Sequence, residues 1–185
     1  MIDPNQDQIA LADTSVAGAQ AAAGAPETML VMRLAGEAFA VPVAEVDEIV
    51  DPIDETTVPG APRHAPSLVN VRGAIAPVID IRSRLGMGPR GERAPGARMI
   101  VLEVQQGGLL MRLAIEAEAV EEVAEIDLAA LMPLPEQGAS WPPELVRGVA
   151  RLDGGLIIVL DTHALFAPSE IVGERGTQTD MARAV

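Results

Sequence analysis

Short runs of aliphatic residues, each followed by a turn signal, recur along the chain from residue 29 to residue 161. The turn signals include Ala-Gly-Glu at 35–37, Pro-Gly at 59–60, Arg-Gly at 72–73 and Asp-Gly-Gly at 153–155. Apolar runs bounded in this way are typical of strands. The predicted strands lie near 29–34, 38–42, 46–50, 67–72, 74–80, 98–105, 109–115, 119–124, 146–152 and 155–161. Many short strands with frequent turns indicate an all-β fold of the barrel or sandwich type.

Outside these runs the sequence changes character. Residues 1–27 are rich in Ala, Gly, Gln and Asp, with Gly and Pro interrupting any helical period, which is typical of a flexible tail. Residues 168–185 are polar and broken by Gly, and they are expected to form a C-terminal tail. The folded unit is therefore expected to span residues 28–167. Within it, brief helical turns are predicted after Asp80 (IRSRLG) and after Asp161 (THALF).

The two halves of this unit resemble each other weakly. The matching segments follow the same order in both halves, and their offset grows from 70 to 81 residues, as insertions in loops would produce. The pairs are MLVMRL (29–34) with MIVLEV (99–104), VDEIV (46–50) with VEEVA (120–124), Arg72-Gly73 with Arg147-Gly148, and PVIDIRSRL (77–85) with IVLDTHALF (158–166). This repeat predicts that each half forms one small barrel of about five strands.

The net charge and the missing residue types exclude several functions. The net charge is −14, and nucleic-acid binding depends on clustered basic residues, so a nucleic-acid partner is not expected. The absence of Lys excludes a Walker-type phosphate loop and Schiff-base chemistry. The absence of Cys excludes thiol catalysis and Cys-ligated zinc. With only two His, neither at metal-ligand spacing, no metal site and no cofactor are expected.

Carboxylates are abundant, so a hydrolase that uses paired carboxylates stays open as an alternative. Such sites usually contain aromatic platforms, and the chain has only Phe39, Trp141 and Phe166, of which Trp141 is expected to pack inward. The inventory favours a binding protein over an enzyme. No apolar run approaches the roughly 18 residues that span a bilayer, and the sequence has no export signal, so an intracellular protein without membrane insertion is expected.

The stretch VNVRGAIAPVIDIRSRLG at 69–86 combines polar residues with two aliphatic runs. Gly73 is expected to permit a tight hairpin turn, and Asn70 to bond the amides of that turn. Asp80 is expected to cap the helical turn that follows it, and Asp161 to cap the second one. These four residues are therefore predicted to be structural.

Together these motifs resemble the CheW-like domain of bacterial chemotaxis coupling proteins. The resemblance runs from about residue 28 to residue 167. It rests on LAGEAFAVPVAEVDEIV (34–50), TVPGAP (57–62), the 69–86 stretch and LDGGLIIVLDTHALF (152–166). The resemblance implies two intertwined, five-stranded SH3-like barrels that flank a hydrophobic groove, with no catalysis and no cofactor.

The resemblance also implies two partners. Coupling proteins bridge the cytoplasmic tip of a transmembrane chemoreceptor to the regulatory domain of the histidine kinase CheA. We therefore expect a cytoplasmic adaptor at the receptor array that is monomeric in isolation. The same fold could serve a pathway that controls motility by pili, or development, and the sequence leaves this output open.

Arg72 has two interpretations. It belongs to the N-x-R-G motif, for which the resemblance implies a role in receptor coupling. Alternatively, it is a surface Arg that pairs with a carboxylate, an interaction worth about 0–1 kcal/mol.

Two acidic stretches, 43–57 and 116–127, contain no basic residue. Charge of this kind can protect strand edges from unwanted pairing. The alternative is that the apolar residues between the charges line the groove for a helical receptor hairpin. The resemblance also places the position of Glu48 in the region of receptor and kinase docking. The predicted coupling residues are therefore Arg72, Val46, Glu48, Ile49 and Val120.

Overall fold

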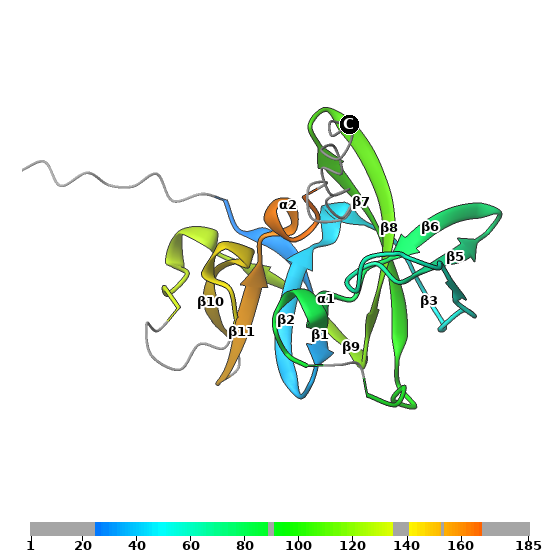
Figure 1. The fold of residues 1–185 in the computed structure, drawn as a ribbon. Helices are drawn as coiled ribbons and strands as arrows, with labels where there is room; N and C mark the ends of the chain where they lie inside the picture. Colours follow the sequence, from blue (N-terminus) through cyan, green and yellow to red (C-terminus); the bar gives the residue numbers. More distant parts are fainter. Residues whose placement is uncertain (1–24, 89–90, 135–140, 153, 168–185) are drawn as a thin grey trace, which may run out of the picture.

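The computed structural model describes residues 25–88, 91–134, 141–152 and 154–167, and two β-sheets lie side by side in it (Figure 1). The five-stranded sheet has the order β10 (Val146–Leu152), β11 (Gly155–Leu160), β2 (Glu37–Pro42), β1 (Glu27–Leu34) and β9 (Ala119–Ile126). The six-stranded sheet has the order β3 (Val46–Val50), β7 (Arg98–Gln106), β8 (Leu109–Ala117), β6 (Ala74–Val78), β5 (Ser67–Val71) and β4 (Thr56–Thr57). The short helices are η1 (Val43–Glu45), α1 (Ile81–Arg84), η2 (Leu128–Ala130), η3 (Pro143–Leu145) and α2 (Thr162–Leu165).

The strand prediction is confirmed. All of the predicted strands are present, and their ends differ from the prediction by two residues at most. The sequence prediction missed β4, because two exposed threonines carry no apolar run. The two predicted helical turns are α1 and α2.

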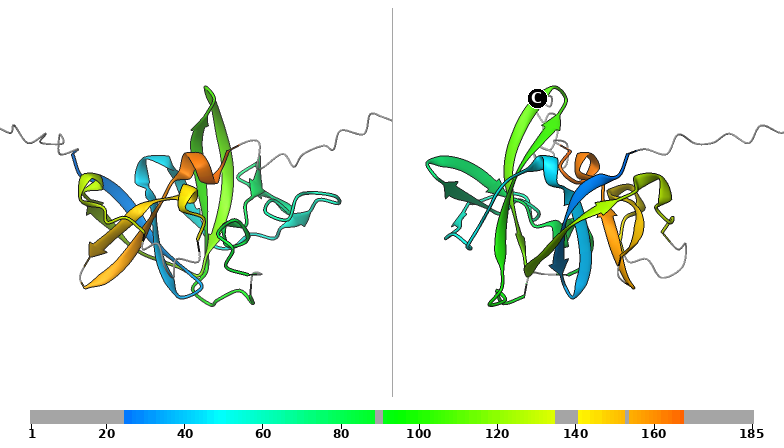
Figure 2. Two further views of the ribbon diagram at one scale, coloured as in Figure 1. Left: turned by 60° about the vertical axis from the view of Figure 1, so that its left-hand side comes forward. Right: turned by 180° about the vertical axis from the view of Figure 1, so that it is seen from behind.

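The expectation that each half of the chain forms its own barrel is wrong. The hairpin β1–β2 of the first half lies in the five-stranded sheet with β9, β10 and β11, and the hairpin β7–β8 of the second half lies in the six-stranded sheet. Parallel pairings of β11 with β2 and of β6 with β8 join the halves. Figure 2 shows the two sheets side by side from two further directions. The intertwined barrels that the resemblance implies are therefore confirmed.

Burial explains why the hairpins are exchanged. Most residues of β1 and β7 are buried, with alternate side chains entering two different apolar clusters. A strand with two apolar faces needs both of them covered. In each exchanged hairpin, one face packs in the apolar cluster that its own sheet encloses, and the other face packs in the large cluster between the sheets. Both apolar faces are therefore covered.

One large and two small apolar clusters form the interior. The large cluster lies between the sheets and includes Phe39, Leu102 and Leu113, all with no exposed surface. The five-stranded sheet encloses a second cluster that includes Met29, and the six-stranded sheet encloses a third that includes Met99.

The prediction that Trp141 packs inward is confirmed. Its indole packs against the large cluster and meets Phe39 edge to face, with ring centres 5.8 Å apart. Edge-to-face contacts of this kind add specific attraction to the burial of area. Trp141 is therefore part of the scaffold between the sheets.

One pair of the internal repeat is also wrong. Arg72 and Gly73 occupy the turn between β5 and β6, whereas Arg147 and Gly148 lie inside β10, where the pairing with β11 shifts register. The counterpart of Gly73 is Gly154, which has φ +84 in the β10–β11 turn. An Arg-Gly dipeptide carries too little information to set a register, whereas strand order and turn position do.

Candidate functional site

β3, at the edge of the six-stranded sheet, contains three of the predicted coupling residues. Its pairing with β7 shifts register between Val46 and Glu48, so Asp47 forms a β-bulge. Because of the bulge, Val46 and Ile49 both pair with residues of the large cluster and share one face, while Glu48 points to the other. Val46 packs against the large cluster, and Ile49 is 40% exposed. The bulge thus brings the two predicted apolar contacts together.

On the opposite face of β3, the Glu48 carboxylate lies between two arginines. Arg112 of β8 reaches across β7, and its Nη2 donates to Asp47 Oδ2 at 2.8 Å and to Glu48 Oε1 at 3.0 Å. Arg72 Nε lies 2.7 Å from Glu48 Oε2. The structure therefore joins two predicted residues, Arg72 and Glu48, with Arg112, which the sequence analysis missed.

Arg72 is presented by a strained, tightly bonded turn. Arg72 and Gly73 are its two central residues, with φ of +52 and +91, the positive values that a type I′ turn requires. The left-handed region costs a non-glycine residue roughly 1–2 kcal/mol. Asn70 Oδ1 accepts a hydrogen bond from the Gly73 N–H at 2.8 Å and so holds the turn closed. This geometry projects the Arg72 side chain into solvent, where it is 80% exposed.

The two aspartates lie at equivalent helix starts. Asp80 is the N-cap of α1, and its Oδ1 accepts a hydrogen bond from the Ser83 N–H at 3.2 Å. Asp161 is the N-cap of α2, and its Oδ1 accepts one from the Ala164 N–H at 2.9 Å. Both carboxylates satisfy backbone donors that the helix itself cannot.

Val120 lies on β9, the edge of the five-stranded sheet, and β9 repeats the construction of β3. Its pairing with β1 shifts register at Glu121, so Val120 and Val123 both pair with residues of the large cluster. Val120 packs against that cluster, and Val123 is 57% exposed. Val120 and Val46 thus occupy corresponding places on the edges of different sheets.

Glu45, in η1 just before β3, connects the two halves of the chain. The buried Thr162 hydroxyl of α2 donates to Glu45 Oε1 at 2.9 Å, while Glu45 Oε2 is buried and accepts no hydrogen bond from any described residue. Burial raises the pKa of Glu45 above its usual value, and the Thr162 hydrogen bond, His163 and Arg147 oppose this rise. The sequence gives no signal for the contact between Glu45 and Thr162, because the two residues lie 117 positions apart.

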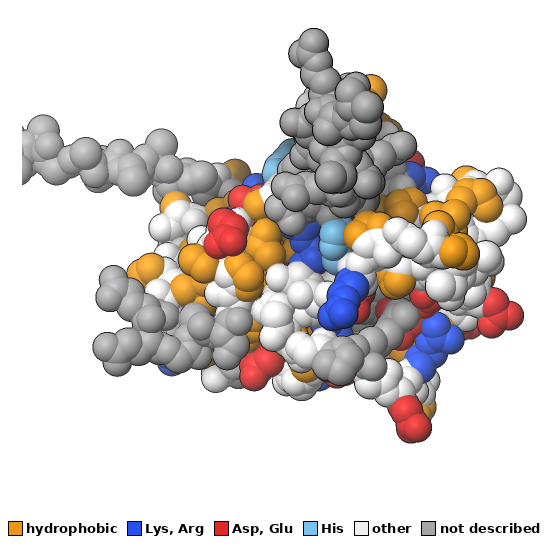
Figure 3. Space-filling model, in the orientation of Figure 1, with side chains coloured by type: hydrophobic (Ala, Val, Ile, Leu, Met, Phe, Trp, Pro, Cys, Tyr) orange, Lys and Arg blue, Asp and Glu red, His pale blue; other side chains and the backbone are white. Residues whose placement is uncertain are grey.

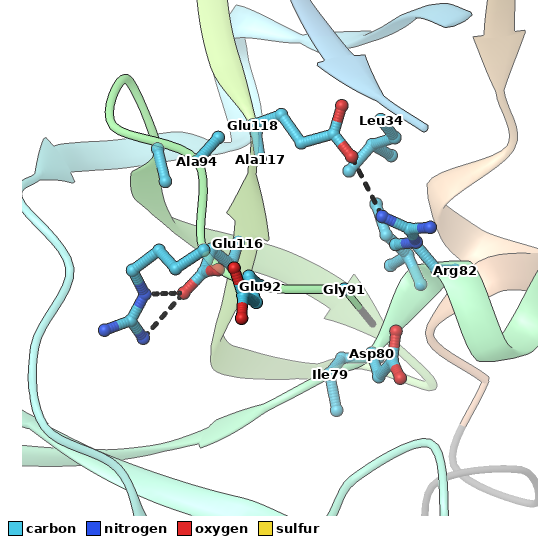
Figure 4. Close-up of a pocket in the computed structure, with 13 residues that line it drawn as sticks. Leu34, Ile79, Asp80, Arg82, Gly91, Glu92, Ala94, Glu116, Ala117 and Glu118 are labelled. Atoms are coloured by element: carbon cyan, nitrogen blue, oxygen red, sulfur yellow. Dashed lines mark hydrogen bonds and ion pairs between the residues drawn. The ribbon is translucent and has the colours of Figure 1, made fainter. Parts of the chain in front are cut away.

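A small hollow beside α1 is lined by four acidic residues, Asp80, Glu92, Glu116 and Glu118 (Figure 4). Its Glu116 accepts a hydrogen bond from Arg93 Nε at 2.9 Å, and its Glu118 accepts one from Arg82 at 2.9 Å. The space into which a small molecule could enter is about 30 Å³, roughly the share of one water molecule. Both carboxylates form ion pairs with arginines.

The described surface has no metal or membrane-spanning feature. No group of three or more His, Asp or Glu is arranged to hold a metal ion within the described ranges. The helices described are all too short to cross a bilayer. Acidic and basic side chains are interspersed on the face that Figure 3 shows, without a broad basic patch on it.

Comparisons with known proteins agree with this architecture. Residues 28–170 match the family described as CheW-like domain. A probable chemotaxis protein CheW of Rhizobium etli is 28% identical over 142 residues, 77% of this chain and 88% of that protein. The chemotaxis protein CheW of Bacillus subtilis is 27% identical over 141 residues, 75% of this chain and 86% of that protein. The crystal structure of the scaffolding protein TtCheW from Thermoanaerobacter tengcongensis aligns with a TM-score of 0.66 at 31% sequence identity, over 78% of this chain and 90% of that one.

Proposed function

Because this chain belongs to the CheW-like domain family, we propose that it couples transmembrane chemoreceptors to the histidine kinase CheA. Its similarity to CheW proteins of other bacteria and to a CheW scaffolding protein supports the general role of a chemotaxis scaffold. The family is non-catalytic, and the chain is not an enzyme. The partners in this proposal are the cytoplasmic tip of a receptor and the regulatory domain of CheA, met in a cytoplasmic receptor array.

The observation that carries the proposal is the edge strand β3. It offers an apolar face, Val46 with the exposed Ile49, and a charged face, where Glu48 lies beside the exposed Arg72. A helical receptor hairpin has an apolar stripe that fits such a face, and the flanking charges fix its register.

The edge strand β9, which is built like β3, supports the proposal of a second binding partner. β9 carries Val120 and the exposed Val123 on the edge of the other sheet. An adaptor must bind two proteins at once, and two separate edges allow this without competition. We assign the β3 edge to the receptor and the β9 edge to the kinase domain.

The test is an NMR titration of isotope-labelled protein. A receptor-tip fragment and the regulatory domain of CheA are added separately, and the shifted amide signals are mapped. The proposal predicts saturable binding of both, with receptor-induced shifts around Val46, Ile49 and Arg72, and kinase-induced shifts around Val120 and Val123. Binding of neither partner contradicts it.

A further inference from the structure

Glu48 is held unequally by its two arginines. Arg112 donates a hydrogen bond to Glu48 Oε1, whereas Oε2 is buried and accepts no hydrogen bond from any described residue, although Arg72 Nε lies 2.7 Å away. The Arg72 N–H is therefore not directed at that oxygen. The Arg72–Glu48 contact is an attraction between charges, and the Arg112–Glu48 contact is a charge-assisted hydrogen bond, which is the stronger kind.

The exposed fractions point the same way. The Arg112 side chain is 25% exposed and the Arg72 side chain 80%. Water and salt weaken an ion pair at an exposed guanidinium much more than at a covered one. Arg72 can therefore leave Glu48 at small cost, while Arg112 stays.

The charge balance of the group depends on Arg112. Asp47 and Glu48 carry two negative charges, and Arg112 binds both with one nitrogen. Without Arg112, two carboxylates would face Arg72 alone. A second, neighbouring carboxylate strengthens the attraction on that guanidinium and keeps it at the protein surface.

We propose that Arg112 is a positioning residue that leaves Arg72 free to bind a carboxylate on the receptor. The Arg72 side chain is 80% exposed and its terminal NH₂ groups donate no hydrogen bond to a described residue, and a planar guanidinium binds a carboxylate through two such donors. Arg112 acts through Glu48 and Asp47 and does not touch the partner. The inference rests on the proposed function, since the partner carboxylate belongs to the receptor.

The other sheet provides a comparison within the same molecule. The hairpin β1–β2 corresponds to the hairpin β7–β8, since Phe39 pairs with Met32 as Leu113 pairs with Leu102. The residue before Phe39 is Ala38, and the residue before Leu113 is Arg112. Ala38 therefore occupies the position in the five-stranded sheet that Arg112 occupies in the six-stranded sheet. Glu122, the counterpart of Glu48, forms no ion pair with any residue that the structure describes. The arrangement is therefore a property of β3 and not of the fold.

The experiment compares Arg112→Gln with the double variant Arg112→Gln/Asp47→Asn. Receptor-fragment binding is measured by titration calorimetry, and the state of Arg72 by hydrogen exchange of its Nε–H, observed by NMR in the free protein. Arg98→Gln is the matched control, because Arg98 lies in the same sheet with its ion pair to Asp51 at 3.5 Å and both side chains exposed.

Arg112→Gln is expected to weaken receptor binding about threefold to tenfold and to slow exchange of the Arg72 Nε–H. Adding Asp47→Asn to this variant is expected to restore both receptor binding and the exchange rate of the Arg72 Nε–H. Arg98→Gln is expected to change neither quantity. Unchanged binding in Arg112→Gln overturns the inference. So does a loss that Asp47→Asn does not restore, since Arg112 would then act by direct contact or on the fold.

The two readouts separate this inference from the proposed function. If the wild-type protein binds no receptor fragment, the proposed function fails. The exchange of the Arg72 Nε–H then still decides whether Arg112 controls Arg72. Unchanged exchange in Arg112→Gln overturns that part on its own.

Discussion

The two edge strands β3 and β9 share a backbone design but differ in their charges. Each has an acidic pair between apolar residues, each has a bulge at the first acidic position, and each turns two apolar side chains toward the same side as the large cluster. At β3, Arg72 and Arg112 flank Glu48, whereas the place of Arg112 beside β9 is taken by Ala38. The two edges thus share their geometry, while of the two only β3 has a carboxylate flanked by two arginines among the described residues.

The largest expected effect tests what the two edges share. Phe39 and Leu113 are counterparts with no exposed surface in the large cluster that supports both edges. Phe39→Ala is expected to destabilise the protein by about 3–5 kcal/mol and Leu113→Ala by about 2–5 kcal/mol. Chemical denaturation checks both values. A loss below about 1 kcal/mol in either variant would mean that the sheets do not share one packed interior.

The next effect tests the corrected repeat. A Cβ added to Gly148 would lie 2.9 Å from both Leu131 Cβ and Met132 O, whereas one added to Gly73 would meet nothing within 4 Å. Gly148→Ala is expected to cost about 2–4 kcal/mol, from overpacking and its positive φ together. Gly73→Ala is expected to cost about 1–2 kcal/mol from backbone strain alone. Thermal melts of the two variants give the order, and equal losses would argue that both glycines serve as turns.

The strand pattern could be predicted from the sequence, and so could the local roles. Asp80 and Asp161 stand directly before short helical patterns, and Asn70 stands three residues before Gly73, so their bonds lie within a few positions. The exchange of hairpins could not be predicted, because similar aliphatic strands fit either sheet equally well. Arg112 was missed for a related reason: its partner Asp47 is 65 positions away, and only the strand order β3-β7-β8 brings them together.

A smaller effect tests the helical turn η1, which precedes β3 and has no counterpart before β9 among the described elements. Glu45, which precedes Val46, corresponds to Ala119, which precedes Val120 and is the first residue of β9. The raised pKa of Glu45 means that the folded protein binds its proton more tightly than the unfolded chain, whose value is near 4.5. The stability this confers is present below that value and is lost as pH rises through the raised pKa.

In the Glu45→Gln variant the side chain does not titrate, so this loss of stability with rising pH is absent. Its amide oxygen can still accept the Thr162 hydrogen bond. The melting temperature of the variant relative to wild type is therefore expected to rise between about pH 4 and pH 7. Paired melts across this range measure the difference. A difference that does not change with pH would show that Glu45 does not titrate differently in the folded state.

The smallest effect on stability comes from the exposed apolar residues of the two edges. Ile49→Ser and Val123→Ser are each expected to change stability by less than about 1 kcal/mol, since both side chains are partly in water. Their effects on binding are expected to differ: Ile49→Ser weakens binding of the receptor fragment, and Val123→Ser weakens binding of the kinase domain. Equal effects on both partners would contradict the assignment of one edge to each.

The most direct test of the central claim is receptor control of CheA activity in a reconstituted array with Arg72→Asn. Asn tolerates the left-handed backbone that Arg72 adopts, at φ +52, so this change removes the charge and spares the turn. We predict a melting temperature close to that of wild type together with loss of most receptor control of the kinase. Full receptor control in the folded variant would contradict the role of Arg72 and of the β3 edge.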